Sequence, residues 1–155
     1  MFKKFRSHRR ECLAGMPLLL LVSLLATLAV ATPASASNAA IAVPFEKHWV
    51  GPGHYVGTAG DGGTIEMWVY DVTFVGNIQQ FRATLQLSLN GQSLTAILDG
   101  HFNFSTARVV LNGMVVDGWL TGAQVHEESR YTGDDENTGG PVFAGTVRLI
   151  PGSDD

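Results

Sequence analysis

Residues 80–89 read QFRATLQLSL, and this stretch decides the class of fold. Apolar residues take every second position from Phe81 to Leu89, and polar side chains fill the positions between them. A period of two places one face of an extended strand against a core and the other in water. Asn90-Gly91 follows at once and suits a tight type I′ hairpin. We therefore expect the chain to return as an antiparallel strand.

The same alternation continues on both sides of this hairpin, with Gly, Asn and Asp clusters between the runs. It predicts about eight strands, a number typical of small sandwiches and barrels. Their expected ranges are 54–58, 64–74, 80–89, 93–99, 101–105, 107–116, 119–130 and 142–150. We predict an all-β domain, a single small antiparallel β-barrel, with a β-sandwich as the alternative. Gly113, Gly122 and Gly145 are the expected places for the bends or bulges that closure requires.

The N-terminal region has the three-part layout of a secretory signal peptide. Basic residues from Lys3 to Arg10 precede an apolar run over 16–30, and small residues follow it. Ala34-Ser35-Ala36 fits a signal peptidase, so we predict cleavage after Ala36. About 15 apolar residues span only about 22 Å of a bilayer core of about 30 Å, which argues against an uncleaved anchor. We expect a secreted, extracellular or periplasmic protein with no stable membrane anchor after cleavage.

Removal of residues 1–36 changes the chemistry of the chain. The only cysteine, Cys12, is lost, so the mature domain is expected to be cysteine-free and without disulfides. Five of the ten Lys and Arg residues and one of the fourteen Asp and Glu residues are also lost, which leaves 5 − 13 = −8. This acidic charge disfavours nucleic acid as a partner. The remaining basic residues stand singly in the sequence: Lys47, Arg82, Arg108, Arg130 and Arg148.

The predicted organisation has four parts. A signal peptide over 1–36 precedes an N-terminal extended segment over 37–53, a barrel domain over 54–151 and an acidic tail over 152–155. The strand over 64–74 carries apolar side chains on both faces, so its second face needs cover. The candidates for that cover are the segment 41–50, a second copy of the chain in a homo-oligomer, or a ligand.

Aromatic side chains are the leading candidates for a binding site. We predict a secreted binding module for a small apolar or amphipathic ligand, with ordinary core packing as the alternative role for each of these residues. The candidates are Trp68, Tyr70, Phe102, Phe104 and Trp119. A self-associating interaction or structural protein is the second hypothesis, with its contact through strand 64–74.

A barrel enzyme of isomerase or cyclase type is the third hypothesis. His126 and Glu128 share one face of an expected strand, so this pair could perform acid–base chemistry at a barrel mouth. A solvated strand end facing Arg130 is the simpler interpretation. The sequence has no G-x-S-x-G elbow and no phosphate-binding loop, and we expect no cofactor.

Metal binding is weakly indicated. The histidines after residue 36 lack the close spacing of a zinc site, so no metal is expected there. Asp134, Asp135 and Glu136 lie in a glycine-flanked loop that offers oxygen ligands for calcium. The loop lacks the regular acid spacing of a calcium-binding loop, and a solvated hairpin tip is the expected role.

The expected architecture resembles the small lipocalin-type, avidin-type, and dirigent or allene-oxide-cyclase-type barrels. His48-Trp49-Val50-Gly51 is similar to the opening G-x-W of lipocalins, although its glycine follows the tryptophan. The resemblance implies a fold and assigns no residue a role.

Overall fold

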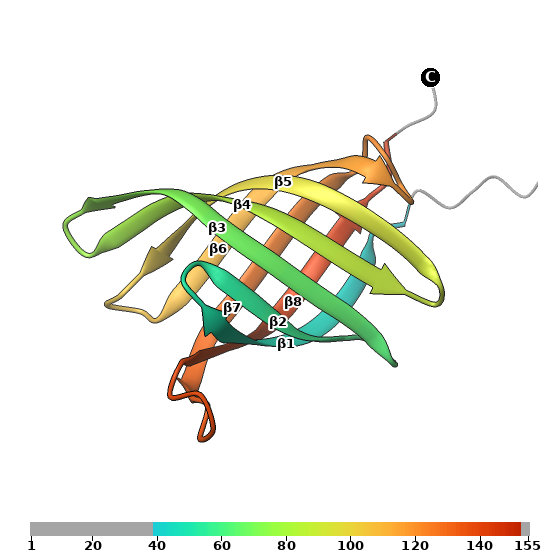
Figure 1. Cartoon of the computed structure of the whole chain (residues 1–155). Helices are drawn as coiled ribbons and strands as arrows, with labels where there is room; N and C mark the ends of the chain where they lie inside the picture. The colour runs from blue at the N-terminus through green and yellow to red at the C-terminus, as the bar shows by residue number, and fades with distance from the viewer. Residues whose placement is uncertain (1–38, 153–155) are drawn as a thin grey trace, which may run out of the picture. The chain divides into compact units, whose positions relative to one another are not determined.

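A computed structural model describes residues 39–152 as eight antiparallel strands that close into a barrel (Figure 1). The predicted signal peptide and residues 153–155 of the acidic tail lie outside the described residues. The strands are β1 (Ile41–Gly51), β2 (His54–Ala59), β3 (Gly63–Val75), β4 (Ile78–Leu89), β5 (Gln92–Asn103), β6 (Arg108–Gly118), β7 (Gln124–Asp134) and β8 (Pro141–Ile150). Each strand pairs with the next, and β8 pairs with β1. The predicted all-β barrel is confirmed, and the described part of the chain has no helix long and apolar enough to cross a membrane.

Three strands differ from the sequence prediction. The strand expected over 119–130 is β7, which begins at Gln124 after a turn over 119–122. The segment 41–51, expected to lie outside the barrel, is β1 and pairs with both β2 and β8. The expected strands 93–99 and 101–105 are one continuous strand, β5, which runs through Gly100. The barrel therefore begins at Ile41, and these differences leave the number of strands unchanged.

The core consists of the inward face of every strand. In β4, Phe81, Ala83, Leu85 and Leu87 are all buried, as the alternation from Phe81 to Leu89 requires. Polar side chains between them point outward, and Arg82 is half exposed. Alternate residues of β4 thus face the core and the solvent, as the period of two in the sequence predicts.

Inward-facing glycines allow neighbouring strands to approach closely. Gly145 in β8 lies between Phe45 of β1 and Ser129 of β7, and a Cβ at this position would collide with the carbonyl oxygen of Glu128. A Cβ at Gly113 in β6 would collide in the same way with the backbone of β5. Gly122, in contrast, lies in the β6–β7 turn. Gly113 and Gly145 therefore allow close approach of neighbouring strands. The register shifts that mark β-bulges lie elsewhere, for example between Tyr70 and Thr73 in β3.

The β3–β4 hairpin extends beyond its neighbour β2 (Figure 1). Pairing with β2 ends at Trp68, where the next N–H, of Val69, donates to the carbonyl of Gly53 at 2.7 Å. A bulge with Asp71 at φ 53° follows, and β3 continues to Val75. The β3–β4 turn is held to the β5–β6 turn by a hydrogen bond from the Phe104 N–H to the Asn77 carbonyl, at 3.0 Å.

The two apolar faces of β3 have different surroundings. Ile65 and Met67 are buried inside the barrel. On the outer face Trp68 is half-buried and stacks on the ring of His54. The segment 41–50 does not lie over this face, because it is a strand of the same sheet. Beyond the bulge Phe74 is 65% exposed and Val75 is 63% exposed. The apolar residues at the start of β3 are therefore part of the core, whereas those at its end are exposed on the protruding β3–β4 hairpin.

Candidate functional site

A pocket enters the barrel at the end where the β1–β2, β3–β4, β5–β6 and β7–β8 turns lie. Its cavity volume is about 40 Å³, and the pocket is partly open to solvent. Its walls are mostly apolar and aromatic, and they come from seven strands. The lining residues are Lys47, Tyr55, Met67, Val69, Gln79, Phe81, Phe102, Val109 and Phe143. Apolar walls with a few polar groups are typical of a site for a small organic ligand.

A continuous series of aromatic rings connects the outside of this pocket to its interior. Exposed Phe74 stacks on Phe104 with their centroids 6.4 Å apart, and Phe104 lies 4.7 Å from Phe102. Phe102 packs edge-on against Phe143 at 5.6 Å, and Phe143 contacts Tyr55 at 5.8 Å. The rings change from 65% exposed at Phe74 to 7% exposed at Phe143. An apolar molecule can thus remain in contact with aromatic surface from the lip to the interior.

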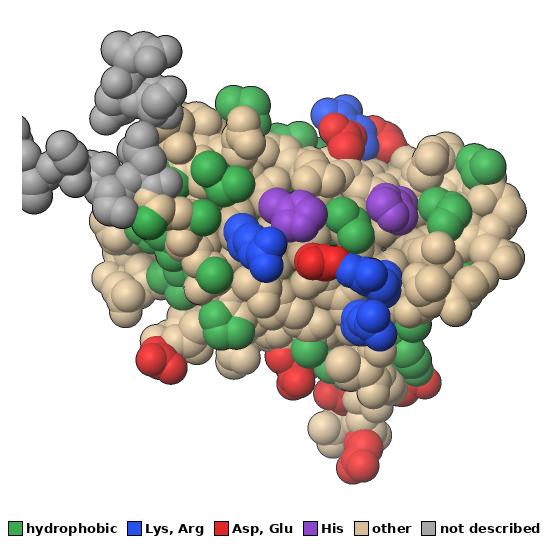
Figure 2. Space-filling model, turned by 180° about the vertical axis from the view of Figure 1, so that it is seen from behind, with side chains coloured by type: hydrophobic (Ala, Val, Ile, Leu, Met, Phe, Trp, Pro, Cys, Tyr) green, Lys and Arg blue, Asp and Glu red, His purple; other side chains and the backbone are tan. Residues whose placement is uncertain are grey.

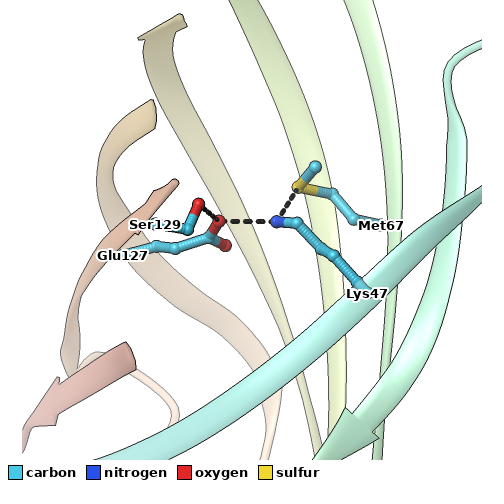
Figure 3. A network of polar contacts seen from close by, with 4 residues as sticks. All are labelled: Lys47, Met67, Glu127 and Ser129. Carbon is cyan, nitrogen blue, oxygen red and sulfur yellow. Dashed lines mark hydrogen bonds and ion pairs between the residues drawn. The ribbon is translucent and has the colours of Figure 1, made fainter. Parts of the chain in front are cut away.

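Lys47, one of the pocket residues, forms an ion pair inside the barrel (Figure 3). The Nζ of Lys47 on β1 lies 2.5 Å from Oε1 of Glu127 on β7 and 3.2 Å from Sδ of Met67 on β3. The Ser129 hydroxyl donates to the same Glu127 oxygen at 3.2 Å. Lys47 is 1% exposed and Glu127 is 0% exposed. Within the described part of the chain, Glu127 Oε2 has no hydrogen-bond partner.

The electrostatics of this pair follow from its burial. Removal from water lowers the pKa of the Lys47 ammonium, and the attraction and hydrogen bond of Glu127 oppose this change without cancelling it. Burial also raises the pKa of the Tyr55 hydroxyl, so Tyr55 stays neutral. The pocket therefore presents apolar walls and one amine whose proton is held less firmly than usual.

The five aromatic residues proposed as ligand contacts lie in three different places. Phe102 lines the pocket, and Phe104 forms part of its lip. Trp68 stacks on His54 outside the barrel, with centroids 5.1 Å apart, and Tyr70 lies below the Arg82 guanidinium. Trp119 packs against the core near the β6–β7 turn, at the other end of the barrel. The structure therefore brings two of the five to the pocket.

Sequence reasoning missed Lys47, Tyr55 and Phe143 as pocket residues. A signal for Lys47 is present, because the alternating positions Val43 and Phe45 precede it in β1 and are buried. Alternate residues of a strand face the same side, so Lys47, two residues after Phe45, also faces the inside of the barrel. The lysine was overlooked because a charged residue normally marks an outward position.

His126 and Glu128, proposed for acid–base chemistry, lie on the outer wall. His126 Nδ1 is 2.7 Å from Asn112 Oδ1, and Glu128 forms an ion pair with Arg108 rather than Arg130. The inward residue between them is Glu127. The pair therefore shares a face as expected, but that face is not at the pocket.

Basic side chains gather on this wall, although they stand singly in the sequence (Figure 2). Arg108 of β6 is the register partner of Arg130 of β7, and His126 of β7 is the partner of Arg148 of β8. The wall thus carries three of the five basic residues that follow residue 36.

The acidic loop is organised as a turn. Asp135 accepts hydrogen bonds from the N–H groups of Asn137 and Thr138 at 2.8 and 2.9 Å, which lowers the pKa of its carboxyl group. Asp134 accepts a hydrogen bond from the Tyr131 hydroxyl. Among residues 39–152 no three His, Cys, Asp or Glu side chains are grouped so as to hold a metal ion. Calcium binding by Asp134, Asp135 and Glu136 stays a prediction.

Comparison with protein-family models, with curated proteins and with solved structures finds no match to this chain.

Proposed function

We propose that the barrel binds a small apolar or amphipathic organic molecule through its open end, as a protein exported by its N-terminal signal. The observation that carries this proposal is the apolar pocket at the open end of the barrel, with the ring series from Phe74 to Phe143 leading into it. A fully packed barrel of this size would have no need of an apolar lip exposed to water. The export step rests on the layout of residues 1–36.

Binding of a neutral aromatic alcohol tests the proposal. The protein is purified after expression of the full chain, and 2-naphthalenemethanol is titrated into it by calorimetry. Phe102→Ala removes a ring from the pocket wall and is expected to weaken binding about tenfold. Val69→Phe narrows the same pocket and is expected to weaken binding further.

Trp68→Ala is the matched control, because Trp68 is also a half-buried aromatic residue but lies outside the barrel. It should leave the affinity unchanged. Absence of saturable heat with the wild-type protein, or equal losses for Trp68→Ala and Phe102→Ala, contradicts the proposal.

Self-association is the second candidate, and a free strand edge favours it. Beyond Val69, β3 pairs with β4 alone among the described strands, while Val72 and Val75 are exposed along the unpaired stretch. Exposed edges of this kind add strands from a second copy. A dimer by analytical ultracentrifugation that dissociates in Val75→Lys supports this candidate, and a monomer at micromolar concentration removes it.

A further inference from the structure

The only lysine between residues 39 and 152 is inside the barrel. Lys47 is 1% exposed, whereas lysine is among the residues least often buried. The other cations of this part of the chain are arginines at least partly exposed to water, at Arg82, Arg108, Arg130 and Arg148. The single primary amine side chain of this part of the chain therefore lies where burial of a charge is most costly.

An amine can do in this place what a guanidinium cannot. Arginine stays protonated in proteins, but a buried lysine readily loses its proton and becomes a nucleophile. Lys47 is one of the residues that line the apolar pocket, which opens to solvent, so a molecule that enters the pocket meets this side chain. Met67 Sδ is a weak hydrogen-bond acceptor, and among residues 39–152 Glu127 is the one carboxylate bound to Nζ.

We propose that Lys47 condenses with an aldehyde group on an apolar ligand and holds that ligand as an imine. This inference rests on the proposed function, because the ligand must first occupy the pocket. The aromatic walls bind the apolar body, and the reactive end of the ligand points toward the inner end of the barrel.

The reaction balances without any further reagent. The lone pair of the neutral Nζ forms a bond to the carbonyl carbon, the carbonyl oxygen takes up a proton, and a carbinolamine results. Loss of the remaining nitrogen proton and of the hydroxyl group as water gives Lys47–N=CH–R. The aldehyde and the amine are therefore converted to one imine and one water molecule, with no oxidation or reduction.

Glu127 suits both stages of this reaction. Its Oε1 lies 2.5 Å from Nζ, so the carboxylate can accept a proton from the amine and return it to the departing hydroxyl group. A protonated imine carries the same positive charge as the ammonium, and Glu127 remains beside it as counter-ion. Lowering of the Lys47 pKa by burial increases the neutral, reactive fraction.

Reductive trapping tests the inference. The protein is incubated with 2-naphthaldehyde and sodium cyanoborohydride near neutral pH, and the adduct is located by peptide mapping. We expect one adduct at Lys47, with the mass of the aldehyde less one oxygen atom, formed at least about tenfold faster than on free Nα-acetyl-lysine amide. Excess 2-naphthalenemethanol, which cannot form an imine, should compete and slow the reaction.

Two variants serve as controls. Lys47→Arg should give no adduct at this position, and Val69→Phe provides a test that does not depend on how Lys47→Arg folds. Val69→Phe keeps the Lys47–Glu127 pair but narrows the pocket, so labelling should slow by about fivefold or more.

The outcomes separate this inference from the proposed function. Binding of 2-naphthalenemethanol without an adduct at Lys47 overturns the imine and leaves the binding function in place. Absence of alcohol binding overturns the proposed function itself. Labelling of Lys47 at an equal rate in urea, or in Val69→Phe, shows unspecific chemistry and also overturns the imine.

Discussion

Lys47 and Glu127 are 80 residues apart in the sequence, and their side chains meet 2.5 Å apart inside the barrel. Strand β8 lies between their strands, since it pairs with β1 on one side and with β7 on the other. Val147, the register partner of Glu127, faces inward from β8 and is fully buried. The ion pair is thus a product of barrel closure.

Loss of one partner of this pair should destabilise the barrel strongly. Lys47→Met leaves the Glu127 carboxylate buried without its cation, which typically costs about 3–5 kcal/mol. The double variant Lys47→Met/Glu127→Leu replaces the pair by apolar side chains and should recover most of that loss. Urea denaturation measures both free energies of unfolding. Equal stability of the single and double variants would show that Glu127 does not depend on Lys47.

The neighbouring ion pair on the outer wall should matter far less. Arg108 and Glu128 are about two-fifths exposed, and ion pairs at that exposure contribute about 0–1 kcal/mol. Arg108→Ala should therefore lower the free energy of unfolding by no more than about 1 kcal/mol. The same urea assay applies, and high salt should reduce the difference further. If Arg108→Ala lowers the free energy of unfolding as much as Lys47→Met does, the Arg108–Glu128 pair contributes more than a surface ion pair.

Gly145→Ala tests the close approach of β8 to β7. The added Cβ would collide with the backbone oxygen of Glu128, which cannot move as a flexible side chain can. We expect a loss of about 3 kcal/mol, the upper range for an overpacked site. Gly51→Ala is the control, because the space around Gly51 is open and the change should stay within about 0.5 kcal/mol. Thermal unfolding compares the two, and equal melting temperatures would argue against the collision.

The strands were predictable where one face is apolar and the other polar. The alternation from Phe81 to Leu89 identifies β4 and its turn, because burial and solvent exposure select residue types at every position. The alternation in β7 is harder to interpret, since the inward set contains Glu127 and Ser129 beside Val125. Polar residues on both faces conceal which face is inside. The sequence therefore offers His126 and Glu128 as candidates for a barrel mouth, whereas Glu127 is the residue that points inward.

The site was less predictable than the fold because it depends on contacts distant in sequence. The period of two correctly places Trp68 and Tyr70 on the face opposite Ile65, but it does not say which face lines a cavity. Burial of Lys47 requires β1 to pair with β8, and sequence alone left this segment outside the barrel. Local patterns thus predict strands, whereas closure determines which polar side chains meet.

The β7–β8 turn should weaken in acid. Hydrogen bonds from Thr138 and Asn137 lower the pKa of Asp135 below its ordinary value of 3.8. The carboxylate therefore stabilises the turn above that pH, and the contribution is lost as the pH falls through the lowered pKa. Amide hydrogen exchange at residues 137 and 138 should accelerate in that range beyond the intrinsic pH trend. Asp135→Asn should remove this pH dependence, and unchanged protection in strong acid would contradict the assignment.

The exposed lip should govern how fast a ligand is taken up. Phe74 and Phe104 stack on each other while remaining 65% and 51% exposed, so their replacement by serine removes little buried surface. The free energy of unfolding should change by no more than about 1 kcal/mol. The association rate constant of 2-naphthalenemethanol, followed by stopped-flow fluorescence, should fall by about threefold or more, because the outermost apolar contact is lost.

Met114→Ser/Val116→Ser is the matched control for this lip. Met114 and Val116 are 53% and 52% exposed, but they lie on β6 away from the pocket. This double variant should leave association unchanged. If both double variants slow association equally, general surface hydrophobicity captures the probe, and the aromatic series has no special part in uptake. If only the lip variant slows it, the path from Phe74 to Phe143 is the route by which an apolar molecule reaches Lys47.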